Sequence, residues 1–267
     1  MKAKDRIIVA LDVDSLEKAK VLVEQLAPYV SCFKPGLELL TSEGAPKVVK
    51  AIHEWGGEVF YDGKFNDIPN TVAGAARAVT KLGVKIFNVH CLGGSRMMKA
   101  ARQAAEEAVM DSEKDSILLS PHPIILGVTL LTSLDYDDLI ELGIEEKIDF
   151  VDPQELSKAK SRRIEQLAVE HLAWLAQECG LDGVIASPQE IRAIREYCQP
   201  EFLIVTPGVR PQWASINDQK RVMTPAEAIK LGADYLVIGR PITKPPAEIG
   251  TPVDAVRKIT EEIASVL

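Results

Sequence analysis

The sequence lacks the features of secreted, membrane-bound and disulfide-rich proteins. Its 267 residues include only four cysteines, which lie far apart and form no C-x-x-C pair. We therefore predict reduced cysteines with a mainly structural role. No apolar run approaches the length of about 18 residues that a membrane-spanning helix needs. The first apolar run, residues 7–11, is too short for a signal peptide. We expect a cytoplasmic protein with no membrane partner.

Positive charge is also scarce. The chain has 31 Lys and Arg residues against 39 Asp and Glu residues, which gives a formal net charge of −8. Because nucleic-acid binding depends on a basic face that displaces counterions, a general nucleic-acid binder is excluded. A small anionic ligand, held by a few local cations, stays compatible with this charge. Hydrophobic residues make up 46% and charged residues 26%, a balance typical of a globular protein rather than a disordered or fibrous one.

Short apolar segments alternate with longer amphipathic ones along the whole chain. The predicted strands are residues 6–11, 30–34, 58–62, 84–90, 124–130, 183–187, 202–207 and 235–239. Helical patterns follow at 16–26, 41–55, 70–82, 95–109, 163–179, 188–197, 225–231 and 253–267. The strands are almost continuously apolar, which is typical of a parallel sheet covered on both faces.

Eight strand–helix pairs predict an α/β fold, a single-domain (β/α)8 TIM barrel over residues 1–267. An open doubly wound sheet is the alternative, although no G-x-G-x-x-G follows the first strand. Gly83, Gly180 and Gly232 stand where helices should end in a left-handed residue. Two polar stretches interrupt the rhythm, a connection at 111–123 and a longer insertion at 134–162 on the rim where barrel enzymes carry their functional loops.

Charged residues of alternating sign follow the first three predicted strands. Asp12, Lys34 and Asp62 end these strands, and Lys64 and Asp67 come directly afterwards in D-G-K-F-N-D. Neighbouring parallel strands lie about 4.8 Å apart, so these side chains should converge at the barrel mouth. A lysine between carboxylates stays an ammonium, which favours an electrostatic or proton-donating role over a Schiff base. The alternatives are a set of surface ion pairs and an Mg²⁺ site at the aspartates, where the lysines would compete with the ion.

The last two predicted strands end in an anion-binding pattern. Gly208 and Arg210 follow the seventh strand in T-P-G-V-R-P-Q, and Gly239 and Arg240 follow the eighth in V-I-G-R. Barrels often bind phosphate at these two loops, where glycine admits the anion to backbone N–H groups and arginine binds it in a bidentate way. Together with the lysines across the mouth, this pattern predicts a phosphorylated substrate.

Three other polar side chains follow the middle strands. Thr132 and Ser133 could contact a heterocycle or a ribose, or simply form a hydroxyl turn. We expect His90, at the end of the fourth strand, to be structural. The remaining histidines show no metal-ligand spacing, so no zinc site is predicted.

The order of these motifs resembles that of the orotidine 5′-phosphate decarboxylase family. The resemblance spans nearly the whole chain through V-A-L-D, F-K-P-G, D-G-K-F-N-D-I-P-N-T, N-V-H, V-T-L-L-T-S, T-P-G-V-R-P-Q, D-Q-K-R and V-I-G-R-P-I-T. The D-x-K-x-x-D-I-P-N-T block is highly specific when it occurs together with G-x-R-P and V-I-G-R-P. Such a resemblance implies the cofactor-free, metal-free conversion of orotidine 5′-monophosphate to uridine 5′-monophosphate and CO₂, the last step of de novo synthesis of that nucleotide.

The resemblance also implies a role for each matching residue. Lys64 would protonate C6 of the pyrimidine, Asp62 would lie against the substrate carboxylate, and Lys34 and Asp12 would hold the ribose. The remaining matches are the pyrimidine contacts Thr132 and Ser133, the phosphate contacts Arg210, Gln219, Gly239 and Arg240, and Asp67, Ile68 and Thr71, which would enter the neighbouring subunit's site in a homodimer.

Two positions depart from the family pattern. Gly63 stands where many relatives have leucine, and Asn66 where bacterial ones often have histidine. A glycine next to Lys64 predicts a less firmly aimed lysine. Two other functions stay open from the residues alone: a Mg²⁺-dependent barrel enzyme acting on a sugar phosphate, and a non-catalytic phosphate-binding barrel.

Overall fold

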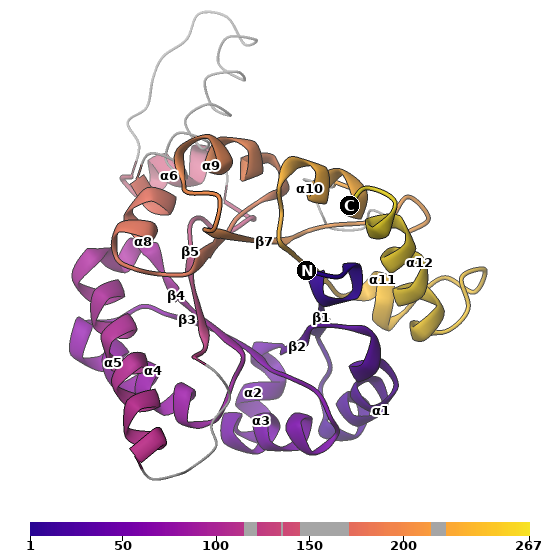
Figure 1. Ribbon diagram of the computed structural model, residues 1–267, viewed down its shortest axis with the longest axis horizontal. Helices are drawn as coiled ribbons and strands as arrows, with labels where there is room; N and C mark the ends of the chain where they lie inside the picture. Colours follow the sequence, from indigo (N-terminus) through magenta and orange to yellow (C-terminus); the bar gives the residue numbers. More distant parts are fainter. Residues whose placement is uncertain (115–121, 135, 145–170, 215–222) are drawn as a thin grey trace, which may run out of the picture.

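The computed structural model describes residues 1–114, 122–134, 136–144, 171–214 and 223–267. Its centre is one sheet of eight parallel strands in the order β2-β1-β8-β7-β6-β5-β4-β3, and the helices form a ring around it (Figure 1). The two end strands, β2 and β3, meet at an isolated bridge between Phe33 and Val59, so that the sheet curls into a barrel. The predicted (β/α)8 barrel is confirmed, and the open doubly wound sheet is excluded.

Each of the eight strands overlaps its predicted apolar segment, but the third continues beyond its predicted end at residue 62 and includes Lys64. They are β1 (Ile7–Leu11), β2 (Cys32–Pro35), β3 (Phe60–Phe65), β4 (Ile86–His90), β5 (Ile124–Val128), β6 (Gly183–Ile185), β7 (Leu203–Pro207) and β8 (Tyr235–Ile238). The helices include α1 (Leu16–Leu26), α2 (Leu37–Glu43), α3 (Ala45–Glu54), α4 (Pro69–Lys81), α5 (Gly94–Lys114), α6 (Tyr136–Glu141), α8 (Trp174–Glu178), α9 (Ile191–Tyr197), α10 (Pro225–Leu231), α11 (Arg240–Thr243) and α12 (Pro252–Ala264).

Two helix predictions need correction. The pattern at 41–55 predicts one helix, but α2 ends at Glu43 and α3 begins at Ala45. Gly44 between them has a φ of 83°, which no right-handed helix contains. Helix α5 continues to Lys114, so the predicted polar connection 111–123 begins as helix. Most of the predicted rim insertion 134–162 and the first part of the predicted helix 163–179 lie outside the described residues.

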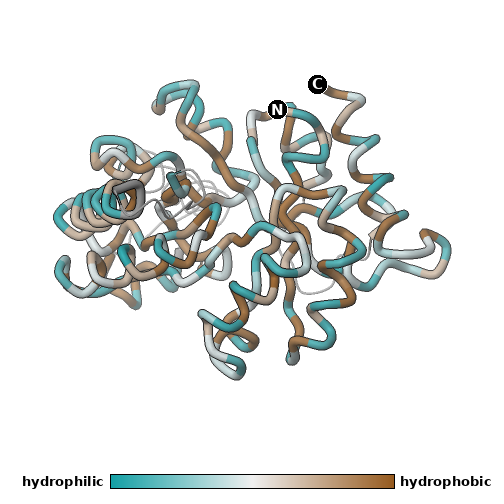
Figure 2. Tube along the Cα trace, turned by 60° about the horizontal axis from the view of Figure 1, so that its bottom comes forward, coloured by the Kyte–Doolittle hydropathy of each residue, from teal (hydrophilic) through white to brown (hydrophobic). Residues whose placement is uncertain are grey.

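Two apolar layers pack against the sheet, one on its inner face and one on its outer face. One is made of strand residues alone and therefore fills the barrel interior; it includes Ile8, Cys32, Phe60, Ile86, Leu126, Val205 and Val237. The other combines the alternate strand residues with the inner faces of the helices. Figure 2 shows apolar residues along the central strands and polar residues recurring along the outer helices. No helix within the described ranges has the length and apolar character to cross a bilayer.

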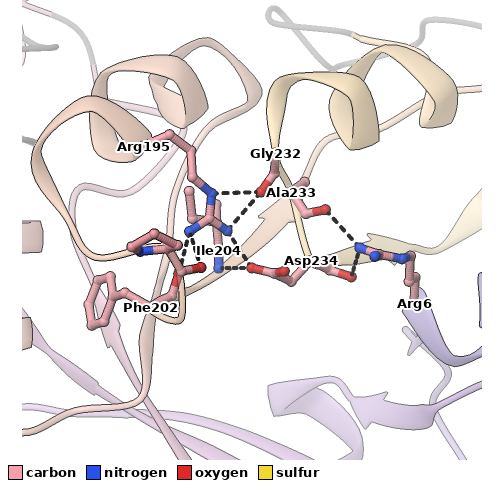
Figure 3. A network of polar contacts seen from close by, with 8 residues as sticks. Arg6, Arg195, Phe202, Ile204, Gly232, Ala233 and Asp234 are labelled. Atoms are coloured by element: carbon pink, nitrogen blue, oxygen red, sulfur yellow. Dashed lines mark hydrogen bonds and ion pairs between the residues drawn. The ribbon is translucent and has the colours of Figure 1, made fainter. Parts of the chain in front are cut away.

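Ion pairs fix the amino-terminal ends of the strands, away from the charged residues of the mouth. The carboxylate of Asp234, just before β8, accepts the backbone N–H of Ile204 on β7 at 2.8 Å and pairs with Arg195 of α9. Arg195 also donates to the carbonyl of Gly232, and Arg6 donates to the carbonyl of Asp234 at 3.3 Å (Figure 3). This network stabilises the end of the barrel at which the strands begin.

The same arrangement recurs between β5 and β6. Asp182, just before β6, accepts the backbone N–H of Ile125 at 2.7 Å. Arg102 of α5 binds both oxygens of this carboxylate, at 2.9 and 3.0 Å. Gly180 and Gly232 precede the two aspartates by two residues and have φ values of 77° and 112°, as predicted for helix-ending glycines.

Candidate active site

The centre of the barrel mouth is a buried carboxylate between two ammonium groups. Lys34 Nζ on β2 lies 2.8 Å from Asp62 Oδ2, and Lys64 Nζ on β3 lies 2.7 Å from Asp62 Oδ1. Asp62 is only 8% exposed. The predicted convergence of strand-end charges is therefore confirmed for these three residues, and the alternative of ordinary surface ion pairs does not fit so buried a carboxylate.

This geometry keeps Asp62 ionised. Burial by itself raises the pKa of the carboxyl group, but the positive charges and hydrogen bonds of Lys34 and Lys64 outweigh burial and lower its pKa to about 2. Both carboxylate oxygens are already engaged by ammonium groups. An Mg²⁺ ion at Asp62 would have to displace them. Among the described residues, no three His, Cys, Asp or Glu side chains form a metal-binding group.

Lys64 has an unusual backbone. Its φ is 45°, and among the described residues it is the one non-glycine residue with a positive φ. The pairing of β3 with β4 shifts register between Tyr61 and Phe65, so Lys64 lies in a bulge. Asn88 of β4, which is fully buried, accepts the Lys64 N–H at 2.7 Å. Asn88 is not among the predicted site residues, although a lone amide inside the apolar strand I-F-N-V-H is a visible signal.

Gly63 does not leave an empty space beside Lys64. The rings of Tyr61 and Phe65 lie with their centroids 5.7 Å apart. A Cβ atom at Gly63 would come within 2.6 Å of Tyr61 Cε1 and 2.8 Å of Phe65 Cε1. The two rings thus occupy the volume that leucine would need. Because the Lys64 backbone is also bonded to Asn88, the structure does not support the expected looseness of the lysine.

Asp12 and Asp67 stand apart from the other three charges. Asp12 is exposed, and Cβ atoms built at Gly36 and Gly239 would lie 3.0 and 3.7 Å from its carboxylate oxygens. Its carboxylate therefore lies between the ends of β2 and β8. Asp67 is exposed and accepts the N–H of Ile68 at 2.6 Å within its own loop. Within the described ranges neither aspartate forms an ion pair with Lys34 or with Lys64, so direct contact within the predicted five-residue array is limited to Lys34, Asp62 and Lys64.

The residues expected to face a neighbouring subunit are exposed. Ile68 precedes α4 and is 66% exposed, although it is a large apolar residue. Thr71 lies in the first turn of α4 and is also exposed. They lie beside Asp67 on the rim of the mouth, on the outside of the chain.

The expected phosphate contacts follow two adjacent strands. Strands β7 and β8 pair in parallel, with Pro207 opposite Val237. Gly208 has a φ of 80°, and Arg210 beyond it is only 6% exposed, with its backbone N–H 2.9 Å from the carbonyl of Met223. Gly239 and Arg240 lie at the end of β8. The predicted contact Gln219 lies outside the described residues.

Two expected contacts and one histidine complete the mouth. Thr132 and Ser133 form an exposed turn after β5. His90 ends β4, where its Nδ1 accepts the N–H of Leu92 at 3.4 Å. Burial lowers the pKa of His90, and the positive charge of Lys64 lowers it further. This histidine is therefore neutral near pH 7.

The cysteines take no part in the mouth chemistry. All four are free and buried. Burial raises the pKa of Cys32 and of Cys91 to about 12, so neither provides a thiolate near neutral pH. The predicted structural role fits this environment.

Comparison with known proteins identifies the family of this chain. Residues 5–259 match the family model described as "Orotidine 5'-phosphate decarboxylase / HUMPS family". An orotidine 5′-phosphate decarboxylase of Moorella thermoacetica is 52% identical over 267 residues, covering 100% of this chain and 95% of the relative. One from Syntrophomonas wolfei is 47% identical over 98% of this chain and 99% of the relative.

Solved structures agree as well. A crystal structure of orotidine 5′-phosphate decarboxylase from Lactobacillus acidophilus has a TM-score of 0.73 and 31% identity, over 96% of this chain and 98% of that one. An uncharacterized conserved protein from Geobacillus kaustophilus gives a TM-score of 0.70 and 31% identity, over 96% and 99% of the two chains. The match thus extends over the sequence and the barrel, and the chain belongs to the orotidine 5′-phosphate decarboxylase / HUMPS family.

Proposed function

We propose that this protein removes CO₂ from orotidine 5′-monophosphate and forms uridine 5′-monophosphate, as the names of its relatives suggest. The observation that carries the proposal is the Lys34–Asp62–Lys64 arrangement, a buried carboxylate with an ammonium group on each oxygen. A site of this kind offers strong positive charge at a fixed position in a poorly solvated place. That is the stabilisation a localised carbanion requires.

Lys64 supplies the charge and the proton. When the bond between C6 and the carboxylate breaks, its electron pair stays on C6 in an sp² orbital that the ring π-system cannot delocalise. The Lys64 ammonium stabilises this pair as CO₂ leaves and then transfers a proton from Nζ to C6. The neutral amine regains its proton from water. Enzymes lower barriers by about 8–23 kcal/mol, and one contact cannot supply the upper part of that range.

Asp62 and the groups around it prepare the substrate. The ionised Asp62 lies beside Lys64, where it would face the carboxylate of the bound substrate and repel it. This repulsion would be relieved as CO₂ leaves. Lys34 and Asp12, at the ends of the first two strands, would hold the ribose. The intact ion pairs also favour a cofactor-free reaction, because the ammonium groups compete with a metal ion for Asp62.

The opposite side of the mouth would bind the rest of the nucleotide. Thr132 and Ser133 would contact the pyrimidine. The phosphate would lie against Arg210, Gln219, Gly239 and Arg240. Binding energy from the remote phosphate can be used to orient the ring against Lys64, which raises the rate of the chemical step.

We further infer a homodimer with shared sites. Asp67 makes no ion pair with the lysines of its own chain in the described ranges, and the apolar side chain of Ile68 is exposed beside it. Burial of Ile68 against a second copy would bring Asp67 and Thr71 to the partner's substrate. Each copy, residues 1–267, would act as one barrel domain with its rim insertion at 134–162.

A direct test follows the absorbance of orotidine 5′-monophosphate after mixing with purified protein treated with EDTA. Loss of orotidylate absorbance with formation of uridine 5′-monophosphate is expected. If activity requires added Mg²⁺, or if orotidine 5′-monophosphate is stable while a sugar phosphate reacts, the proposal fails. Binding of phosphate compounds without any turnover would instead indicate a non-catalytic barrel.

A further inference from the structure

The backbone of Lys64 needs an explanation beyond its place in the charged cluster. A left-handed conformation costs an L-residue with a long side chain about 1–2 kcal/mol relative to the right-handed region. Such a conformation persists only where the surrounding structure holds it. Lys64 has a φ of 45° between Gly63 and Phe65, and neither neighbour has a positive φ. The constraint must therefore come from a contact outside the local sequence.

Asn88 provides that contact with both ends of its amide. Its Oδ1 accepts the backbone N–H of Lys64 at 2.7 Å, and its Nδ2 donates to Asp62 Oδ1, also at 2.7 Å. The same Asp62 oxygen accepts a hydrogen bond from Lys64 Nζ at 2.7 Å. The amide orientation is fixed by its partners, since an N–H requires the oxygen and a carboxylate requires the NH₂ group. Asn88 thus links the main chain of Lys64 to the acceptor of its ammonium group.

The position of Asn88 makes this link rigid. Asn88 is fully buried in the middle of β4, and it pairs in register with Leu126 on β5. A buried amide without partners would be costly, so the two bonds are tightly required. β4 is joined on both sides, to β3 and to β5, and cannot easily move away. The strand therefore gives the bulge at Lys64 a fixed reference point.

We propose that Asn88 is a positioning residue, which holds the Lys64 backbone in its left-handed conformation and thereby aims the ammonium group at the reacting carbon. The inference rests on the proposed decarboxylation. In this role Asn88 acts through Lys64 and Asp62, to which its amide is bonded. Without its amide, the Lys64 N–H and one Asp62 oxygen each lose a partner, and the bulge can relax towards a negative φ.

Two substitutions test this role. Asn88→Ala removes both hydrogen bonds. Asn88→Asp keeps the shape and the acceptor for the Lys64 N–H but replaces the donor with a charge that repels Asp62. A matched control is Thr206→Val on β7: Thr206 is equally buried, and its hydroxyl has no hydrogen-bond partner in the described part of the chain.

The experiment measures kcat and KM for orotidine 5′-monophosphate, the dissociation constant of uridine 5′-monophosphate, and the thermal midpoint of each variant. A misplaced catalytic group can cost about 100-fold in rate, and we expect a loss of that order in kcat for both Asn88 variants. KM and product affinity should be nearly unchanged, because the phosphate and ribose contacts stay intact. Thr206→Val should keep normal kinetics.

Several outcomes would overturn the inference. The inference fails if a folded Asn88→Ala protein loses less than about tenfold in kcat. It also fails if kcat and product affinity fall equally, because that result would indicate a merely structural role. If neither variant folds, amide hydrogen exchange on the unmodified protein decides: the Lys64 amide should be strongly protected, and rapid exchange contradicts the bond to Asn88. An unmodified protein that fails to decarboxylate refutes the proposed function instead.

Discussion

Lys34 and Asp62 join the two strands at which the barrel closes. Their side chains meet at 2.8 Å, although β2 and β3 are the two ends of the strand order. Backbone contact at this seam includes the isolated bridge between Phe33 and Val59 and a 2.8 Å bond from the Phe33 N–H to the carbonyl of Glu58. The ion pair thus lies at the edge with the least regular strand pairing. Formation of the charged site and closure of the barrel are therefore coupled.

Because of this coupling, the free energy of unfolding should depend on pH in the acidic range. Burial raises the pKa of Asp62, but Lys34 and Lys64 outweigh it and hold the pKa at about 2, below the ordinary 3.8. A carboxyl group with a lowered folded-state pKa stabilises the protein above its ordinary pKa, and this stabilisation is lost as the pH falls through the folded value. We expect the free energy of unfolding to decrease as the pH falls from 3.8 to about 2.

Denaturant unfolding at a series of pH values, followed by circular dichroism, measures this effect. Asp62→Asn is the control, because it has no carboxyl group to titrate. Its free energy of unfolding should change less over the same interval. Parallel curves for the two proteins would contradict the lowered pKa.

Replacing Lys64 by alanine should abolish turnover while the fold and nucleotide binding persist. Removal of one preorganised charge-stabilising donor costs about 10²–10³ in kcat, and Lys64 would also supply the proton. The measurements are kcat and the dissociation constant of uridine 5′-monophosphate. Lys85→Ala is a suitable control, since the Lys85 ammonium bonds to Ser31 at the opposite end of the barrel. A Lys64→Ala protein within about tenfold of normal kcat would refute the assigned role.

The strand positions could be predicted because buried parallel strands leave a clear signal. Each is a short apolar run between amphipathic segments, and the alternate faces of all eight are covered. The helix ends at Gly180 and Gly232 were predictable from local conformation alone. Gly44 was not, because apolar residues continue at helical spacing on both sides of it. Local pattern thus locates the elements better than it locates their interruptions.

The candidate site was predictable in its residue types and only partly in its geometry. Strand ends that meet at one edge brought Lys34, Asp62 and Lys64 together as expected. The direction of Asp67 depends on a loop conformation, which the strand pattern does not determine. The positive φ of Lys64 depends on Asn88, a residue 24 positions away, so no local signal predicts it. Tertiary contacts therefore decide how the site is aimed.

A methyl group at Gly63 should destabilise the protein. The Cβ atom would lie 2.6 Å from Tyr61 Cε1 and 2.8 Å from Phe65 Cε1, so the rings must move. Overpacking of this kind costs about 1–3 kcal/mol, and we expect Gly63→Ala to lose that much free energy of unfolding. Gly74→Ala in α4 is the matched control. A Cβ atom there meets nothing within 4 Å, and alanine in a helix should stabilise by about 1 kcal/mol. Equal shifts in the two variants would show that the rings do not restrict Gly63.

Arg240→Ala should weaken phosphate-bearing ligands selectively. A charge-assisted hydrogen bond contributes about 1.5–3 kcal/mol, which is the expected loss in binding free energy for uridine 5′-monophosphate. Binding of uridine, which has no phosphate, should be unchanged; titration calorimetry can compare the two. Arg257→Ala is the control, because Arg257 of α12 lies over the ring of Tyr29 and is not among the expected phosphate contacts. An equal loss for uridine and its monophosphate would mean that Arg240 is assigned to the wrong group.

Mixed dimers should test whether two subunits share each site. Lys64→Ala and Asp67→Ala should each be inactive alone, the first for lack of the proton donor and the second for lack of the carboxylate that we expect from the partner. A dimer with one subunit of each kind contains one site with a native Lys64 from one subunit and a native Asp67 from the other. Differently tagged subunits, purified as verified mixed dimers, should therefore regain up to half of the normal kcat per dimer. Each parent variant should stay inactive when mixed with itself. If verified mixed dimers show no activity, Asp67 does not act across the interface, and its carboxylate must serve the Ile68 loop of its own chain, to which it is bonded at 2.6 Å.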